Sequence, residues 1–120
     1  MKIEEAIKYC LNKKGAKETY PFDEETLVFK VGNKMFGLVY DRNDEIGLNL
    51  KCDVDLSLAL RHQYEGIIPG YHMNKKHWNT IIFDKDVPDE EIIRLINISY
   101  ELVFKSLTKK VQKEIKEDKN

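Results

Sequence analysis

The chain of 120 residues has the length of one ordinary domain, with 42% hydrophobic and 34% charged residues. It contains only six Gly, three Pro and two Cys, which excludes a disordered chain, a collagen-like repeat and a disulfide scaffold. The 20 basic and 21 acidic residues nearly cancel, to a net charge of −1. Because no global positive field exists, binding to a phosphate backbone would have to come from a local cluster of charge.

The N-terminus and the cysteines indicate the compartment. Met1 is followed at once by charged residues, not by the apolar run of a signal peptide, and nowhere do 18 apolar residues follow one another. Cys10 and Cys52 lie within apolar patterns and form no CxxC pair, so we expect both to be buried, reduced and without a chemical role. These features predict a cytoplasmic protein without a membrane segment.

The first half of the chain predicts a helix followed by three strands. Residues 3–11 place apolar side chains at helical spacing, and Gly15 can supply the left-handed residue that ends such a helix. Gly32-Asn33 is a two-residue hairpin signal, and residues 41–44 form a second turn. We therefore expect an antiparallel meander of strands at residues 26–31, 34–40 and 46–50.

The second half predicts a helix, a strand and a long helix. Asp53 is a suitable N-cap for a helix whose apolar face extends to Tyr64. Three breakers then open an irregular segment: Gly66, Pro69 and Gly70. A strand resumes at residues 78–83, and Pro88 and Asp89 begin the last helix. The polar stripe of that helix is so narrow that more than one neighbouring element must cover the helix.

These elements describe a two-layer α+β domain in which the antiparallel meander packs against the N- and C-terminal helices, with a middle helix (α-β-β-β-α-β-α). We assign residues 1–110 to this single domain. Residues 111–120 are mostly charged and are expected to form a solvated tail that can fray. The broad apolar surface of the last helix could also serve as a dimer interface, so we expect a monomer or a weak homodimer.

One stretch concentrates residue types that are common in functional loops: Gly70-Tyr71-His72-Met73-Asn74-Lys75-Lys76-His77-Trp78-Asn79. One interpretation is that its aromatic residues pack inward while its polar groups are solvated. The other is binding to nucleic acid or phosphate. In that case the phosphate contacts would be Arg61, Lys75 and Lys76, the hydrogen-bonding amides Asn74 and Asn79, and the stacking face Tyr71 or Trp78.

A metal site or a catalytic site finds little support in the same stretch. His72 and His77 are five residues apart, with no Cys or carboxylate in a ligand-spaced cluster. The chain has no GxSxG, HExxH, GxGxxG or P-loop motif. We therefore expect no metal, no cofactor and no enzymatic activity.

Several stretches together match one known family. The longest is residues 69–79, and the others are Tyr20-Pro21-Phe22, Lys34-Met35-Phe36, Leu48-Asn49-Leu50-Lys51-Cys52, Leu60-Arg61 and Ser99-Tyr100-Glu101-Leu102-Val103. On these stretches the chain resembles the MmcQ/YjbR family of small bacterial proteins along nearly its full length. Val54 departs from the pattern, since the family often has Pro there, but either residue suits a first helical position.

The resemblance implies a compact α+β domain with an antiparallel sheet, related to the CyaY-like and secretion-chaperone-like folds. It also implies weak DNA binding through a double-wing-like arrangement, in which sheet edges or hairpins meet DNA. The residues expected to bind nucleic acid are Lys51, Arg61, His72, Asn74, Lys75, Lys76, His77 and Trp78; whether they bind DNA or brace the fold stays open. The near-neutral charge favours the alternative, a protein-interaction or regulatory module without a nucleic-acid role.

Overall fold

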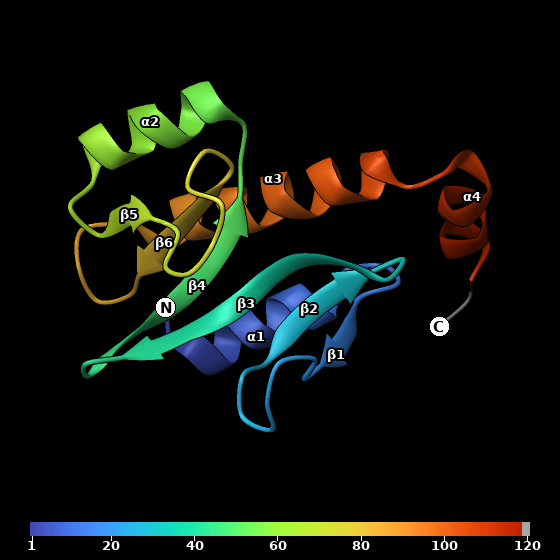
Figure 1. The fold of residues 1–120 in the computed structure, drawn as a ribbon, viewed down its shortest axis with the longest axis horizontal. Helices are drawn as coiled ribbons and strands as arrows, with labels where there is room; N and C mark the ends of the chain where they lie inside the picture. Colours follow the sequence, from blue (N-terminus) through green and yellow to red (C-terminus); the bar gives the residue numbers. More distant parts are fainter. Residues whose placement is uncertain (119–120) are drawn as a thin grey trace.

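A computed structural model describes residues 1–118, and its centre is a six-stranded sheet (Figure 1). The strands lie in the order β1-β2-β3-β4-β6-β5, and every neighbouring pair is antiparallel, which confirms the predicted α+β class. The elements are α1 (Ile3–Leu11), β1 (Lys17–Thr19), β2 (Val28–Val31), β3 (Lys34–Arg42), β4 (Glu45–Lys51), α2 (Val54–Gln63), β5 (Ile67–Pro69), β6 (Trp78–Ile82), α3 (Asp89–Ser106) and α4 (Lys109–Glu117).

Two tight turns set the register of the central hairpins. Gly32 and Asn33 both have positive φ, at 55° and 66°, which is the conformation that a two-residue turn between twisted strands requires. Asn43 and Asp44 repeat it between β3 and β4, with φ of 54° and 63°. The predicted meander is therefore confirmed, and β3 and β4 extend one or two residues beyond their predicted ends.

One face of the sheet carries the main hydrophobic core, and α1, α2 and α3 all contribute to it. The predicted N-cap is confirmed, because Asp53 accepts a hydrogen bond from the backbone N–H of Leu56 at 3.0 Å. The expected role of Gly15 was wrong: α1 ends at Leu11 with Asn12 as its C-cap, and Gly15 takes a positive φ of 75° in the turn that follows. The hydroxyl of Tyr9 on α1 donates to Asn97 on α3 at 2.8 Å, so α3 is covered by the sheet and by α1, as its narrow polar stripe predicts. The core includes Ala6, Cys10, Phe29, Phe36, Leu48, Leu50, Leu60, Ile81, Leu95, Ile96 and Tyr100.

The opposite face, which we call the open face, is covered by loops and, within residues 1–118, by no helix. Figure 1 looks onto it, with α1 and α3 behind the sheet and the yellow loop of residues 70–77 in front. Side chains at alternate strand positions point to this face, including Leu38, Tyr40 and Asn49. A small cluster of Val28, Leu38 and Trp78 packs there with Met73 from the loop.

A buried serine ties α3 to the sheet where β3 and β4 diverge. Ser99 is fully buried, and its Oγ accepts from the Lys51 N–H at 2.8 Å and donates to the Phe36 carbonyl. We expect Ser99→Ala to lower the free energy of unfolding by about 2 kcal/mol in a urea titration, because two buried backbone groups lose their partner. The matched control is Ser106→Ala at the exposed end of the same helix, expected to cost about 0.5 kcal/mol or less. Equal costs would contradict this role.

The structure adds two short edge strands that the sequence pattern did not indicate. β1 contains polar residues and pairs with β2 through Thr19 and Val28. β5 lies within the segment predicted to be irregular, and its Ile67 pairs with Ile81 of β6. Pro69 is tolerated because it lies on an edge strand, where its missing N–H interrupts no hydrogen bonding between strands. Pairing with a neighbouring strand, and not an alternating pattern of polar and apolar side chains, thus decides the conformation of both segments.

The segment expected as a solvated tail contains the separate helix α4. Thr108 caps it by accepting from the Val111 N–H at 3.2 Å, and α4 has no fully buried residue. Val111 and Ile115 nevertheless pack against the main core, which an apolar i, i+4 pair in a charged helix allows. The last two residues of the predicted tail, 119–120, lie outside the described residues.

Candidate nucleic-acid interface

The loop of residues 70–77 is a compact turn held by its own backbone. The Gly70 N–H donates to the Trp78 carbonyl at 2.8 Å, and the Trp78 N–H donates to the Asn74 carbonyl at 2.9 Å. The Asn74 side chain accepts from the Lys76 N–H at 2.9 Å. A Cβ at Gly70 would lie 2.8 Å from that of Trp78, so the loop closes only with glycine at this position.

Two of the predicted phosphate-binding cations brace this loop from inside. Arg61 on α2 is half-buried; its Nε donates to the Asn79 side chain at 2.7 Å, and its Nη2 donates to the Lys75 carbonyl. The Lys75 ammonium donates to the Gly70 carbonyl at 2.9 Å. Both cations therefore satisfy groups of the protein, and only the remaining N–H donors are available to a ligand.

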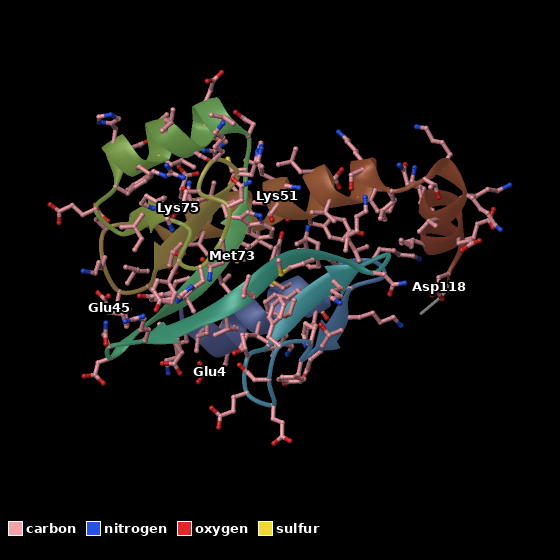
Figure 2. The ribbon with its side chains drawn as sticks, viewed as in Figure 1. Glu4, Glu45, Lys51, Met73, Lys75 and Asp118 are labelled. Atoms are coloured by element: carbon pink, nitrogen blue, oxygen red, sulfur yellow. The ribbon has the colours of Figure 1, made fainter. Side chains whose placement is uncertain are left out.

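The other predicted residues separate into exposed and covered groups. Trp78 is only 8% exposed and packs against Val28 and Leu38, so its ring presents no open face to a base. Its cross-strand partner Lys51 is half-buried at the end of β4. The exposed members of the predicted set are His72, Asn74, Lys75, Lys76 and His77. Figure 2 shows Lys75 and Met73 on the loop, with Lys51 near the end of β4.

Positive charge concentrates elsewhere, at the end of the molecule built around α4. A Cβ on Gly15 would meet Ile115 and a Cβ on Gly32 would meet Val111, so the end of α1, the β2–β3 hairpin and α4 lie together (Figure 1). We define the lysine-rich end as residues 12–17, 30–34 and 101–118. It holds four carboxylates, Glu101, Glu114, Glu117 and Asp118, and ten lysines: Lys13, Lys14, Lys17, Lys30, Lys34, Lys105, Lys109, Lys110, Lys113 and Lys116.

The remaining described residues carry nine basic and 17 acidic side chains. Positive and negative charges are therefore strongly separated in this protein, although its net charge is only −1. Sequence reasoning missed this end because Lys13 and Lys110 are almost 100 residues apart. A usable signal was present in the apolar pair Val111 and Ile115, which indicates a docked helix. Docking brings the lysines of α4 to those that follow α1.

An open cleft of about 550 Å³ lies on the open face, between the loop of residues 70–77 and the loop before β2. Its floor includes Leu38, Tyr40 and Asn49 from β3 and β4, and its walls include Phe22 and Tyr71. Sequence reasoning placed Tyr71 at a candidate site but did not connect it with Phe22. The only available signal was the presence of aromatic residues in two loops.

The two thiols of the described residues are both buried, which changes their pKa values. Burial raises the pKa of the Cys10 thiol to about 12, and burial is also the main cause that raises the pKa of Cys52. Both cysteines are buried and free, as predicted. Residues 1–118 contain no group of three or more His, Cys, Asp or Glu side chains that could hold a metal ion. Among the same residues, no helix combines the length and the apolar character needed to cross a bilayer.

The fold and the loop define a class: small α+β domains with one antiparallel sheet, whose open face is crossed by a Gly-Tyr-His-Met-Asn-Lys loop. The model of the YjbR family matches residues 11–102, and the chain belongs to this family. It is 31% identical over 113 residues to Escherichia coli (strain K12) YjbR, described as an uncharacterized protein, covering 94% of this chain and 96% of that protein. Bacillus subtilis (strain 168) YyaQ, also described as uncharacterized, is 34% identical over 113 residues, covering 82% and 95%.

Solved structures agree with this assignment. The crystal structure of Deinococcus radiodurans DR2400, a protein with a DUF419 domain, superposes with a TM-score of 0.86 at 40% identity, covering 95% of this chain and 87% of that chain. A crystal structure of a Pseudomonas syringae protein superposes with a TM-score of 0.73 at 28% identity, covering 86% and 99%. The likeness extends over almost the whole domain.

Proposed function

We propose that this YjbR-family domain binds DNA weakly, and that it does so through the lysine-rich end. The observation that carries the proposal is the separation of charge: ten lysines against four carboxylates at one end of a protein whose net charge is −1. A local excess of this kind attracts a phosphate backbone, while the acidic remainder orients the protein on it. The lysines carry no base-specific hydrogen-bond pattern, so the binding is largely independent of sequence.

The internal bonds of Arg61 and Lys75 argue for a secondary role of the loop. A guanidinium that already holds Asn79 and the Lys75 carbonyl would give up buried bonds to reach a phosphate. In this proposal Lys76 is the loop cation that remains free to approach DNA, since residues 1–118 offer its ammonium no hydrogen bond or ion pair. His72, Asn74 and His77 are exposed beside it and can add contacts of the kind first predicted.

The test is fluorescence anisotropy of a labelled 20-base-pair duplex at several salt concentrations. If about four lysines reach phosphates, the slope of log K against log salt is about −3 to −4. We expect Lys109→Gln/Lys110→Gln to weaken binding about tenfold at low salt and to reduce the slope by about 2, because two phosphate contacts are lost. Both side chains are exposed, so the melting temperature should stay unchanged.

The matched control, Lys76→Gln/Lys85→Gln, removes the same charge at the far end of the molecule and is expected to weaken binding less than threefold. Equal or greater loss in this control would move the contact surface to the loop. Association that is insensitive to salt would overturn DNA binding. So would the absence of binding at about 25 mM salt, because low salt strengthens binding to phosphates. Salt-insensitive association would favour the protein-interaction module instead.

A further inference from the structure

The cleft on the open face has the size and composition of a small-molecule site, which lies apart from the lysine-rich end. Its volume of about 550 Å³ is in the range of pockets that bind metabolite-sized ligands. Four stretches of chain line it, and six of the twelve lining residues are apolar or aromatic. The features that identify a ligand are an amide on the floor and a cation at the rim.

The amide belongs to Asn49, which is only 3% exposed. Its Oδ1 accepts from the Thr80 hydroxyl at 2.5 Å, and the Thr80 hydroxyl accepts from the Tyr71 N–H at 3.0 Å. Because Thr80 has one hydroxyl proton and gives it to Asn49, the amide is oriented with its Nδ2 as the free end. Among residues 1–118, Ser57 Oγ is the buried side-chain nitrogen or oxygen atom without a partner, so Asn49 Nδ2 is not sealed inside the protein. Asn49 lines the cleft, and Nδ2 can therefore donate there to an oxygen acceptor of a ligand.

The rim carries the guanidinium of Arg42, stacked on an aromatic wall. Its Cζ lies 4.4 Å from the centre of the Tyr71 ring, and that ring meets Tyr40 edge-on at 5.9 Å. Stacking leaves the N–H groups of a guanidinium free at its edges, where a carboxylate can accept two of them. The aromatic edges and the Met73 side chain suit an aromatic ring in the space between floor and rim.

Two carboxylates also border the cleft, and neither neutralises Arg42 directly. Asp23 accepts from the backbone N–H groups of Glu25 and Thr26 at 2.8 and 2.6 Å, which holds its pKa below the usual range. Asp41 precedes Arg42 on β3, so its side chain alternates to the other face of the strand. Arg42 therefore remains available to an anion at the rim.

We propose that this cleft binds an aromatic carboxylic acid whose far end carries an oxygen acceptor. The carboxylate lies against Arg42, the ring lies between Tyr40, Tyr71 and Met73, and the far oxygen accepts from Asn49 Nδ2. The cleft would then give this domain a ligand-binding role that does not depend on DNA. Two family-matching stretches, residues 20–22 and 69–79, meet at it.

The experiment is a ¹H–¹⁵N NMR titration with 4-hydroxyphenylpropionate, following the side-chain amide of Asn49 and the backbone amide of Tyr71. Two matched probes each lack one group: phenylpropionate lacks the far oxygen, and 2-(4-hydroxyphenyl)ethanol lacks the carboxylate. We expect the complete probe to shift both signals and to bind about tenfold more tightly than either matched probe, since one hydrogen bond or ion pair is worth about a factor of ten.

Two variants assign the groups. Arg42→Gln is a surface change that should remove the preference for the acid over the alcohol, and Asn49→Ala should remove the preference for the hydroxylated probe. Asn49→Ala also leaves the buried Thr80 hydroxyl without its acceptor, so the folding of this variant is checked by its melting temperature. If the Asn49→Ala variant does not fold, the Arg42→Gln variant alone decides the test. The control is Arg94→Gln on α3, which should change neither preference. Equal binding of the three probes, shifts confined to other residues, or no shift with the complete probe would overturn the proposal.

Discussion

A Gly47→Ala variant is expected to lose about 3 kcal/mol or more of unfolding free energy. Gly47 lies in β4, where the backbone of β6 passes directly over its Cα. A Cβ there would lie 1.8 Å from the Ile81 carbonyl oxygen and 3.1 Å from the Ile82 Cα. Backbone atoms cannot withdraw as a side chain can, so the β4–β6 pairing itself would have to open.

Urea unfolding followed by circular dichroism measures this cost, and amide hydrogen exchange locates it. The amides shared by β4 and β6 should lose protection, while those between β2 and β3 keep theirs. Gly37→Ala is the matched control, because a Cβ at Gly37 meets the movable side chains of Leu50 and Phe29 at 3.2 and 3.3 Å. Its cost should be about 1 kcal/mol. Similar costs for the two variants would show that β4 and β6 do not approach so closely.

The second large effect is expected at Arg61, whose guanidinium joins α2 to the loop of residues 70–77. Arg61→Met keeps the apolar stem and removes every donor, which leaves the Asn79 side chain and the Lys75 carbonyl without this partner. Asn79 is 2% exposed, so water cannot replace the bond without local opening. We expect a loss of about 2–3 kcal/mol, because hydrogen bonds to a charged group are among the stronger ones.

The measurement is thermal and urea unfolding together with the amide spectrum of the loop, which should broaden or shift. Arg94→Met is the control: this arginine pairs with Glu91 on the surface of α3, and its loss should cost about 1 kcal/mol or less. Unchanged stability of Arg61→Met together with weaker DNA binding would contradict a bracing role and restore Arg61 as a phosphate contact. Loss of stability with unchanged DNA affinity would agree with the lysine-rich end.

The expectation of two histidines and several cations at one site depended on proximity along the chain. Residues 70–79 are indeed one compact unit, and Arg61 reaches it from α2. Proximity could not show that Lys75 donates to Gly70 inside the same loop, because that bond depends on the folded path of the backbone. The interpretation that aromatic residues pack inward was correct for Trp78, whereas Tyr71 remains 38% exposed at the cleft.

The sequence by itself determined the elements whose signals are local. The hairpin at Gly32-Asn33 needs two residues that tolerate positive φ, the cap at Asp53 needs an acceptor near a free N–H, and α3 needs a wide apolar face. The tertiary structure alone decided the rest. β5 is a strand because β6 lies beside it, and α4 docks because Gly15 and Gly32 leave room for its two apolar residues. The lysine-rich end and the cleft depend on contacts between segments that are far apart in the sequence. The free energy of those contacts comes from residues of several segments together, so no short stretch of sequence predicts them.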